Sequence, residues 1–379
     1  MSNIVFKKLG DLATFINGYP FKTKDWASNG LPIIRIQNLN NKNAPFNYYN
    51  SEINEKFLVK KGDILISWSG SIGIYEWEGE DALLNQHIYK VDFNKDIINK
   101  TYFKYIVKIS LDKALQYLHG STMKHITKKY FEQIPVPVPD LNKQKNIAEL
   151  LEVAKSLIDK RKAQIAALSD LTHSVFLEMF GDPIKNTRKW NLKSFEEIAK
   201  IDTTMVKNFD NYLEYKYIGI DNIEKNTGRL VNVKTVGEVK PTSSKYLFTD
   251  DHIIYSKIRP YLNKVAIPKF KGLCSADSYP ILADENVTTK EFLTYILRSQ
   301  LFLNHVNSQS KRTNIPKVNK KQLMDFNTIC PPLDLQKDFT NKVKNIELQI
   351  EKLNGSMKYI DNIFQSLMQR AFRGELFNN

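Results

Sequence analysis

Apolar residues recur at helical spacing along two long stretches of the chain. From Phe339 onward they alternate strictly at intervals of four and three residues, over more than four heptads. A seam of this kind packs one helix lengthwise along another. Residues 141–180 show a looser version of the same pattern. We therefore expect two long helices that pair, with these residues at the helix–helix and partner interface: Ile147, Leu150, Ala154, Leu157, Leu168, Leu171, Val175, Phe339, Val343, Ile346, Ile350, Leu353, Met357, Ile360, Phe364 and Leu367.

The two remaining stretches mix short β-type runs with amphipathic helical segments. The β-type runs include LPIIRIQNL, GDILISWS and HIYKVDF in the first stretch, and YKYIGI and HIIYSKI in the second. Such mixtures, separated by turn-rich loops, are typical of α/β (mixed α+β) domains. The pattern predicts a globular domain at 1–140, a long helix at 141–180, a second globular domain at 181–332 and a closing helix at 333–379.

The chain repeats itself at low identity. Gln144-Lys145 recurs as Gln336-Lys337, 192 residues later, each time after a proline-containing stretch. The segment IIRIQNL aligns with YIGIDNI, and GDILIS aligns with DDHIIYS, in the same order in both halves. A divergent tandem repeat of a domain followed by a helix explains this order. If a pseudo-two-fold axis relates the two copies, the long helices form an antiparallel coiled coil.

Proline-rich joints stand before both long helices. The first joint reads IPVPVPDLNKQKNIAELLE and the second reads ICPPLDLQKDF. Proline cannot continue a preceding helix and favours an extended backbone, so we expect a stiff, extended exit from each domain. Asp140 or Asn142 then offers the N-cap of the first long helix.

The charge of the chain favours a polyanionic partner. The 379 residues include 55 Lys and Arg against 41 Asp and Glu, a formal net charge of +14. Residues 1–140 carry net +4 and residues 181–332 carry net +8, whereas each helical segment carries only +1. The charge thus lies on the globular domains, where nucleic acid is a suitable partner. No apolar run reaches the ~18 residues of a membrane span, and two cysteines give no disulfide framework, so we expect a cytoplasmic protein.

Polar and aromatic clusters lie between the β-type runs, among them GYPFKTKDW and NQH in the first domain and SKIRPYLNK and SADSY in the second. Lys and Arg suit phosphates and guanine edges, Asn and Gln suit adenine edges, and Ser and Thr suit either. One such cluster is more often a solvated loop, and recurrence at matching repeat positions leaves a binding surface and solvated loops equally open for the set. The predicted DNA-binding residues are Lys22, Lys24, Arg35, Gln37, Asn38, Ser69, Ser71, Asn85, Gln86, His87, Lys124, His125, Lys207, Asn222, Lys257, Arg259, Tyr261, Lys264, Ser278, Lys311, Arg312 and Asn314.

Motifs of catalysis are missing from the sequence. The chain has no G-x-x-x-x-G-K-[ST] loop, no G-x-G-x-x-G, no H-E-x-x-H and no N-P-P-[FYW] tetrapeptide of an amino-methyltransferase. Its six histidines are dispersed. We expect no catalytic site, no metal and no cofactor in this chain. A self-contained nuclease that uses Asp221, Glu238 and Lys240 stays open as an alternative.

The order of these features resembles the specificity subunit of type I restriction–modification enzymes. The most specific segments are FLEMFGDP with the following Asn and Trp190, and RAFRGEL at 370–376. The resemblance implies two target-recognition domains on an antiparallel coiled coil, each domain reading one half of a bipartite, asymmetric site in double-stranded DNA. It also implies that the helices set the spacer and dock two methyltransferase (modification) subunits, which support restriction (translocase and endonuclease) subunits. Those partners would use S-adenosylmethionine, ATP and Mg²⁺.

A second alternative is a coiled-coil adaptor whose basic domains bind protein or RNA. This alternative leaves the segments at the domain ends unexplained. We therefore favour a non-catalytic DNA specificity subunit.

Overall fold

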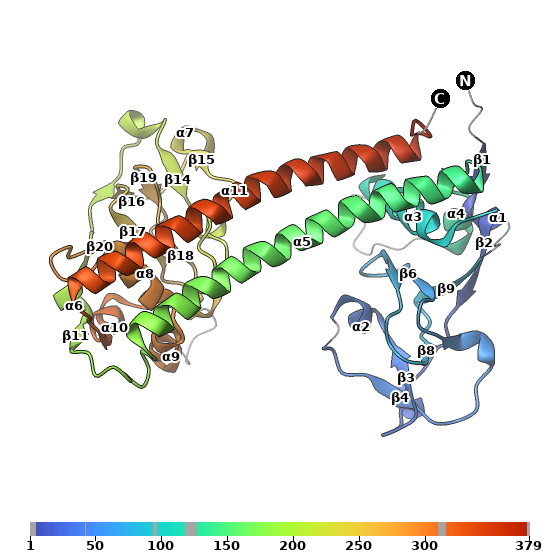
Figure 1. The fold of residues 1–379 in the computed structure, drawn as a ribbon, viewed down its shortest axis with the longest axis horizontal. Coiled ribbons are helices and arrows are strands. Elements are labelled where there is room, and N and C mark those ends of the chain that lie inside the picture. The colour runs from blue at the N-terminus through green and yellow to red at the C-terminus, as the bar shows by residue number, and fades with distance from the viewer. Residues whose placement is uncertain (1–4, 42, 94–96, 118–126, 310–315, 377–379) are drawn as a thin grey trace. The chain divides into compact units, whose positions relative to one another are not determined.

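The structure is a computed structural model that describes residues 5–41, 43–93, 97–117, 127–309 and 316–376. The chain divides into two compact units. The first unit comprises residues 1–163 together with 355–379, and the second comprises 164–354. Both divisions fall inside long helices, so each unit contains one globular domain and part of each helix (Figure 1).

The globular part of the first unit has mixed α+β structure. Its helices are α1 (Leu9–Leu12), α2 (Ile36–Asn40), α3 (Lys100–Tyr117) and α4 (Lys128–Glu132), with 3-10 helices η1 (Thr23–Asp25) and η2 (Glu55–Phe57). Its strands are β1 (Phe6–Lys8), β2 (Ala13–Asn17), β3 (Leu31–Ile34), β4 (Asn47–Tyr49), β5 (Leu58–Val59), β6 (Ile64–Ser67), β7 (Gly73–Glu76), β8 (Ala82–Leu84), β9 (Ile88–Phe93) and β10 (Pro135–Pro137). They form two four-stranded sheets, in the orders β2-β9-β6-β7 and β4-β3-β8-β5, and the pair β1-β10. The first sheet and α3 share a core around Phe15, Ile66 and Phe103.

The globular part of the second unit is built in the same way. Its helices are α6 (Phe195–Ile198), α7 (Val236–Val239), α8 (Lys290–Arg298), α9 (Gln300–Gln309) and α10 (Lys320–Met324), with 3-10 helices η3 (Asp210–Tyr212), η4 (Ile220–Asn222) and η5 (Pro260–Leu262). Its strands are β11 (Leu192–Ser194), β12 (Ala199–Ile201), β13 (Met205–Val206), β14 (Lys216–Ile218), β15 (Lys234–Thr235), β16 (Lys245–Phe248), β17 (His252–Ser256), β18 (Val265–Ala266), β19 (Gly272–Cys274), β20 (Ser278–Ala283) and β21 (Asn327–Ile329). The sheet orders are β12-β20-β17-β18, β13-β16-β19-β14-β15 and the pair β11-β21.

The two units share their strand pairing. One sheet of each unit contains a parallel pair, β3 with β8 and β14 with β19. The other sheet pairs β6 with β9 and β17 with β20, both antiparallel. The registers agree as well, because Ser67 lies opposite Ile88 and Ser256 lies opposite Ser278. This agreement at low sequence identity confirms the prediction of two tandem domains of mixed α+β structure.

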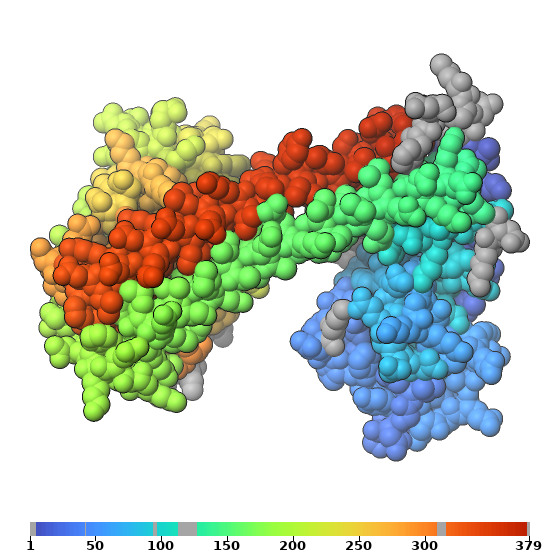
Figure 2. All heavy atoms as spheres, in the orientation of Figure 1, coloured from blue at the N-terminus to red at the C-terminus, as the bar shows by residue number. Residues whose placement is uncertain are grey.

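The long helices are α5 (Leu141–Phe180) and α11 (Leu333–Phe372), each of 40 residues. In the first unit the beginning of α5 packs against the end of α11, with Ile158 and Met368 buried in the same core. In the second unit the end of α5 packs against the beginning of α11, and the rings of Phe176 and Phe339 meet edge-on at 5.6 Å. There the atoms of the two helices lie directly against each other (Figure 2). The helices therefore run antiparallel, as predicted.

The structure corrects which apolar side chains of α5 face α11. Leu157 and Leu171, predicted at the helix–helix and partner interface, are 48% and 45% exposed. Ile158 and Phe176 are buried instead. Because α5 carries apolar residues on more than one side, its spacing alone does not select the inward face. The other predicted interface residues form a buried group (Ile147, Ala154, Phe339, Val343, Ile346 and Phe364) and a half-buried group (Leu150, Leu168, Val175, Ile350, Leu353, Met357, Ile360 and Leu367).

The proline-rich joint before α5 is itself a strand. It is β10, which pairs antiparallel with β1, and the backbone N–H of Val138 extends the pairing by donating to the carbonyl of Val5 at 2.8 Å. Asp140 then caps the helix, since its Oδ1 accepts a hydrogen bond from the Lys143 N–H at 2.9 Å. Asn142 already lies inside α5.

A buried glutamine ties the beginning of each long helix to its domain. Gln144 accepts a hydrogen bond from the Asn99 N–H at 2.8 Å, and its amide nitrogen donates to the carbonyls of Ile97 and Pro139 at 3.0 and 2.8 Å. Gln336 likewise accepts from the backbone N–H of the α8 N-cap at 3.0 Å and donates to two carbonyls at 3.1 and 2.8 Å. The repeated Gln-Lys pair therefore has a structural cause, which lies in the glutamine.

Candidate nucleic-acid interface

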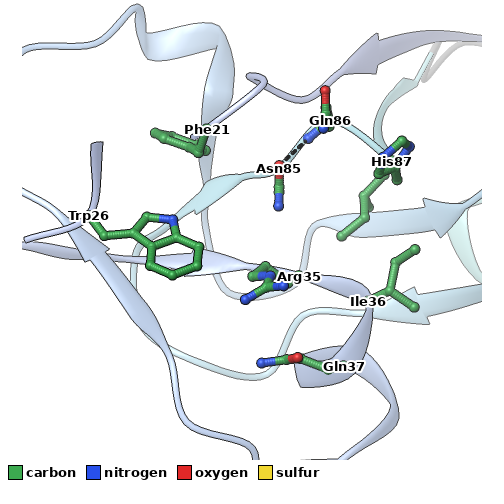
Figure 3. Close-up of a pocket in the computed structure, with 9 residues that line it drawn as sticks. Phe21, Trp26, Arg35, Ile36, Gln37, Asn85, Gln86 and His87 are labelled. Carbon is green, nitrogen blue, oxygen red and sulfur yellow. Dashed lines mark hydrogen bonds between the residues drawn. The ribbon is translucent and has the colours of Figure 1, made fainter. Parts of the chain in front are cut away.

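In the first unit a polar pocket opens at the end of a pair of parallel strands. Because β3 and β8 are parallel, their carboxyl ends meet at one edge of the sheet. The residues that follow these ends, 35–37 and 85–88, come together there (Figure 3). The pocket has a volume of about 410 Å³ and is lined by Phe21, Trp26, Arg35, Ile36, Gln37, Asn85, Gln86, His87 and Ile88.

The cation of this pocket is Arg35, which is half-buried. Its Nη1 donates a hydrogen bond to Oδ1 of Asn47 at 2.9 Å. The guanidinium carbon lies 5.5 Å from the ring centroid of Trp26, within the range of a cation–π contact. These two contacts fix the direction of the guanidinium plane inside the pocket.

A second polar group of the pocket comes from the end of β8. Oδ1 of Asn85 accepts a hydrogen bond from the Gln86 N–H at 2.7 Å, and the amide nitrogen of Asn85 faces the pocket (Figure 3). The end of β2 passes close by, since a Cβ on Gly18 would lie 2.1 Å from the Asn85 carbonyl oxygen. Only glycine permits that approach, so Gly18 helps to hold Asn85 in place.

An aromatic stack borders the pocket on the side of His87. The ring of Trp68 meets His87 edge-on at 5.1 Å and stacks on Tyr89 at 5.7 Å. Burial raises the pKa of Tyr89 to about 12, so its phenol is neutral at ordinary pH. The stack gives His87 a rigid apolar support.

The second unit has a pocket at the corresponding strand edge, beyond the parallel pair β14 and β19. Gly219 stands where Arg35 stands in the first unit, and Asp221 stands where Gln37 stands. Burial raises the pKa of Tyr217, against a hydrogen bond from Ser275 that lowers it. The volume is about 470 Å³, and the lining residues are Tyr217, Gly219, Ile220, Asp221, Asn222, Asn232, Lys234, Val239 and Ser275.

A buried cation of the second unit follows the end of β17. Lys257 occupies the position that Trp68 has after β6, and its Nζ lies 4.8 Å from the ring centroid of Tyr279. Lys257 is 8% exposed, and burial lowers the pKa of its ammonium, with the neighbouring charge of Lys317 acting in the same direction. Lys317 itself pairs with Asp277 at 3.3 Å. The second domain thus carries a lysine where the first carries a tryptophan.

Two asparagines predicted to contact DNA close turns with their side-chain amides, and Asn222 also lines the second pocket. Oδ1 of Asn38 accepts a hydrogen bond from the Arg35 N–H at 3.1 Å, and its amide nitrogen donates to two carbonyls at 3.1 and 3.2 Å. Asn222 does the same for η4, accepting from the Gly219 N–H at 2.8 Å and donating to two carbonyls at 3.0 Å. Their amides close the turn after a strand, which is why they recur at matching repeat positions.

Two further predicted contacts of the second domain are buried or bonded within the domain. Ser278 begins β20 and is fully buried, so it does not reach the surface. Lys264 directs its Nζ to the carbonyl of Ile220 at 2.9 Å, where it supports η4.

The remaining predicted DNA-binding residues divide by exposure. Exposed are Lys22, Lys24, Gln37, Ser71, His87, Lys207, Arg259 and Tyr261, and half-buried are Ser69, Asn85 and Gln86. Lys124, His125, Lys311, Arg312 and Asn314 lie outside the described residues.

The sequence-based prediction missed the apolar walls of the first pocket and most of the second pocket. Phe21 and Trp26 belong to the segment GYPFKTKDW, of which the sequence-based prediction includes only the two lysines. The sequence feature that could have identified them is the presence of aromatic residues in a polar loop. Asn232 and Lys234 gave no such signal, because only the folding of the chain brings them beside Ser275.

Of the three residues of the nuclease alternative, Glu238 lies in α7, Lys240 is the C-cap of the same helix and Asp221 lies in η4. Oε2 of Glu238 accepts a hydrogen bond from the Thr235 N–H at 2.7 Å in the capping box of α7, which lowers the pKa of the carboxyl. Asp221 is exposed and lies 3.9 Å from the Lys264 ammonium. Across the part of the chain that the structure describes, no three His, Cys, Asp or Glu side chains group as a metal site. None of the helices described is long and apolar enough to span a bilayer.

Two tandem α+β domains, each with a polar pocket at the same strand edge, and two antiparallel long helices define a two-site recognition scaffold. The chain belongs to the family of the type I restriction modification DNA specificity domain, whose model matches residues 1–168 and 187–358. It is a specificity subunit of a type I restriction–modification system with two tandem recognition domains. This assignment replaces the adaptor alternative.

Known relatives agree with the family assignment. The chain is 29% identical to the type I restriction enzyme EcoDI specificity subunit of Escherichia coli, over 83% of this chain and 78% of that protein. It is 23% identical to the MjaVIII specificity subunit of Methanocaldococcus jannaschii, over 85% and 81%. The crystal structure of the S subunit from M. genitalium matches the fold with a TM-score of 0.60 at 15% identity, over 98% of this chain and 97% of that one.

Proposed function

We propose that this chain binds double-stranded DNA and that each globular domain reads one half of a bipartite, asymmetric site. The observation that carries the proposal is the pair of pockets, which occupy one strand edge in each domain but are lined by different side chains. Guanidinium, ammonium, amide and hydroxyl groups at such an edge suit base edges and phosphates. Since the two sets of side chains differ, the two half-sites differ.

The long helices supply the second part of the proposal. They would set the spacer between the half-sites and dock two methyltransferase subunits, which support the restriction subunits. Apolar side chains that the helix pair leaves exposed support a protein contact there; they are Val153, Leu157, Leu171, Leu177, Leu348, Tyr359 and Ile363. Leu157 and Leu171 therefore remain in the predicted partner interface.

The division of labour follows from this arrangement. The recognition segments are residues 1–140 and 181–332, and the helical segments are 141–180 and 333–379. The chain itself is non-catalytic. S-adenosylmethionine, ATP and Mg²⁺ are used by the partner subunits, in the cytoplasm.

Methylome sequencing of cells that express this chain with its methyltransferase subunits tests the proposal. The expected result is methylation of one bipartite, asymmetric sequence. A chain in which residues 181–332 are exchanged for the corresponding domain of a relative is the sharper arm. It should change one half-site and leave the other half-site and the spacer unchanged. A change in both half-sites, or in neither, contradicts the assignment of one domain to one half-site.

A further inference from the structure

We propose that Arg35 reads a guanine in the half-site bound by the first domain, through the O6 and N7 acceptors of its major-groove edge. This inference rests on the proposed function, because it assigns a base to a domain that reads DNA. Arg35 is the single arginine of residues 1–140. The rigid fork of N–H donors on arginine matches two adjacent acceptors, which a lysine ammonium does not.

The fold prepares Arg35 for this contact at both ends of its side chain. Its backbone N–H is held by Oδ1 of Asn38 at the carboxyl end of β3. Its guanidinium is held by Oδ1 of Asn47 and lies over the ring of Trp26. A side chain fixed in advance loses less freedom on binding, so more of its binding free energy is available to distinguish one base from another.

Among the residues that the structure describes, no carboxylate forms an ion pair with Arg35. The residues that line its pocket include no Asp or Glu. Within the described ranges of the chain, the cations that form ion pairs are lysines, His252, Arg229 and Arg373. A half-buried guanidinium without a counter-charge favours a ligand that presents acceptors.

Asn85 supplies a second donor from the neighbouring strand. Its Oδ1 is occupied by the Gln86 N–H, so its amide nitrogen is the group that it offers to the pocket (Figure 3). Donors from β3 and β8 therefore converge on the space between them. Guanine presents two acceptors in the major groove, whereas adenine N6 and cytosine N4 present donors that would meet these donors. The pocket thus selects guanine over both.

The second domain has no arginine at the position that corresponds to Arg35. Gly219 replaces Arg35 at the end of β14, and the buried Lys257 lies at the end of a different strand, β17. The guanine is therefore assigned to one half-site only. That restriction gives the experiment an internal control, because the second half-site must keep its base preference.

The test uses the full chain in complex with its methyltransferase subunits. Wild-type, Arg35→Gln, Arg35→Lys and Lys60→Gln complexes are compared for binding to duplexes that carry each of the four bases at every position of both half-sites. Arg35→Gln should reduce the preference for guanine at one position of the first half-site by roughly 10- to 100-fold. Arg35→Lys keeps the charge and should lose part of the preference. Lys60 is exposed in the turn after β5 and is not among the residues that line the pocket, so Lys60→Gln should leave the base preference of both half-sites unchanged.

Several outcomes overturn the inference. They are a wild-type first half-site without a guanine preference, an unchanged preference in both Arg35 variants, and a loss of affinity in the Arg35 variants that is the same for all four bases. If Arg35→Gln does not assemble, Arg35→Lys decides the question with the same readout. A wild-type complex that prefers no bipartite duplex contradicts the proposed function itself, and that result is distinct from a failure at Arg35 alone.

Discussion

The two recognition domains share one backbone frame but carry their cations at different positions. In the first domain Arg35 follows β3 and Trp68 follows β6. In the second domain Gly219 and Lys257 take these positions. The strand pairing is the same, while the side chains at the strand ends are exchanged. The difference shows how a tandem repeat can read two unlike half-sites, because the frame that holds the reading side chains does not depend on their chemistry.

The domains agree where the frame itself is made. Gln144 and Gln336 are both fully buried and bind backbone groups of their own domains. Asn38 and Asn222 close the same turn after a strand. Side chains that bond to the backbone of the domain recur, whereas the residues that directly follow the strand ends, such as Arg35 and Gly219, do not.

The largest expected effect comes from removing the shared anchors. Gln144→Leu and Gln336→Leu each leave a buried N–H and two carbonyls without their partner. Unsatisfied buried groups cost about 1–3 kcal/mol each, so each variant should lower the free energy of unfolding by roughly 3–5 kcal/mol. Denaturant unfolding monitored by circular dichroism measures the change.

The matched control for this pair is Gln349→Leu, at an exposed position of α11. It should change the free energy of unfolding by less than about 0.5 kcal/mol. A large loss in one anchor variant and none in the other would break the comparison, since it would mean that the two domains are not held in the same way.

A smaller effect is expected where the domains differ beside the first pocket. Gly18→Ala would place a Cβ 2.1 Å from the Asn85 carbonyl oxygen, so the backbone must move. We expect a loss of about 2–3 kcal/mol in the free energy of unfolding. The displacement of Asn85 should also weaken base preference in the first half-site alone. Both are measured on the purified complex, by thermal unfolding and by duplex competition.

Thr204→Ala is the counterpart in the second domain. Phe15 of β2 and Ile201 of β12 occupy the same position in their pairings with β9 and β20. Gly18 lies three residues after Phe15, and Thr204 lies three residues after Ile201. Thr204 is exposed, so its variant should lose less than about 1 kcal/mol. Equal losses in the two variants would count against a close approach that is particular to the first domain.

The smallest expected effect concerns the buried lysine of the second domain. Burial lowers the pKa of Lys257, so the folded protein releases this proton at a lower pH than the unfolded chain. Burying the charged ammonium lowers the free energy of unfolding. This loss is fully present below the pKa that Lys257 has in the folded protein, and it disappears as pH rises from that value toward the pKa of the unfolded chain. Lys257→Met should therefore stabilise the protein at pH 7, by on the order of 1 kcal/mol or less, and this gain should shrink in alkaline solution.

Thermal unfolding at pH 7 and at alkaline pH measures the effect of Lys257→Met. The variant should also change binding of the second half-site while the first half-site keeps its preference. Arg259→Met, an exposed position in the same loop, should show no pH-dependent gain in stability. A gain that does not vary with pH would place the effect in packing and not in the charge.

Much of the fold could be predicted because its signals are local or repeated. The heptad spacing after Phe339 marks a helix whose partner must be another long helix, and the recurring Gln-Lys pair marks two equivalent helix beginnings. The candidate site was predictable only in part. Arg35, Gln37 and Asn85 were found because polar residues follow β-type runs, and parallel strands bring such residues together. Residue type alone did not separate Asn38, which binds the backbone, from Asn85, which faces the pocket.

The sequence by itself determined the period of the helices, the tandem order of the domains, the distribution of charge and the family. These properties depend on spacing and composition along the chain. Only the tertiary structure decided which side of α5 is buried, which amides are used by turns, and that Trp26 lies over the guanidinium of Arg35. The physical reason is that burial and hydrogen bonding depend on groups far apart in the chain. Serine is a residue type that can contact DNA, but Ser278 lies in β20, a core strand. There it pairs with β17 and is fully buried.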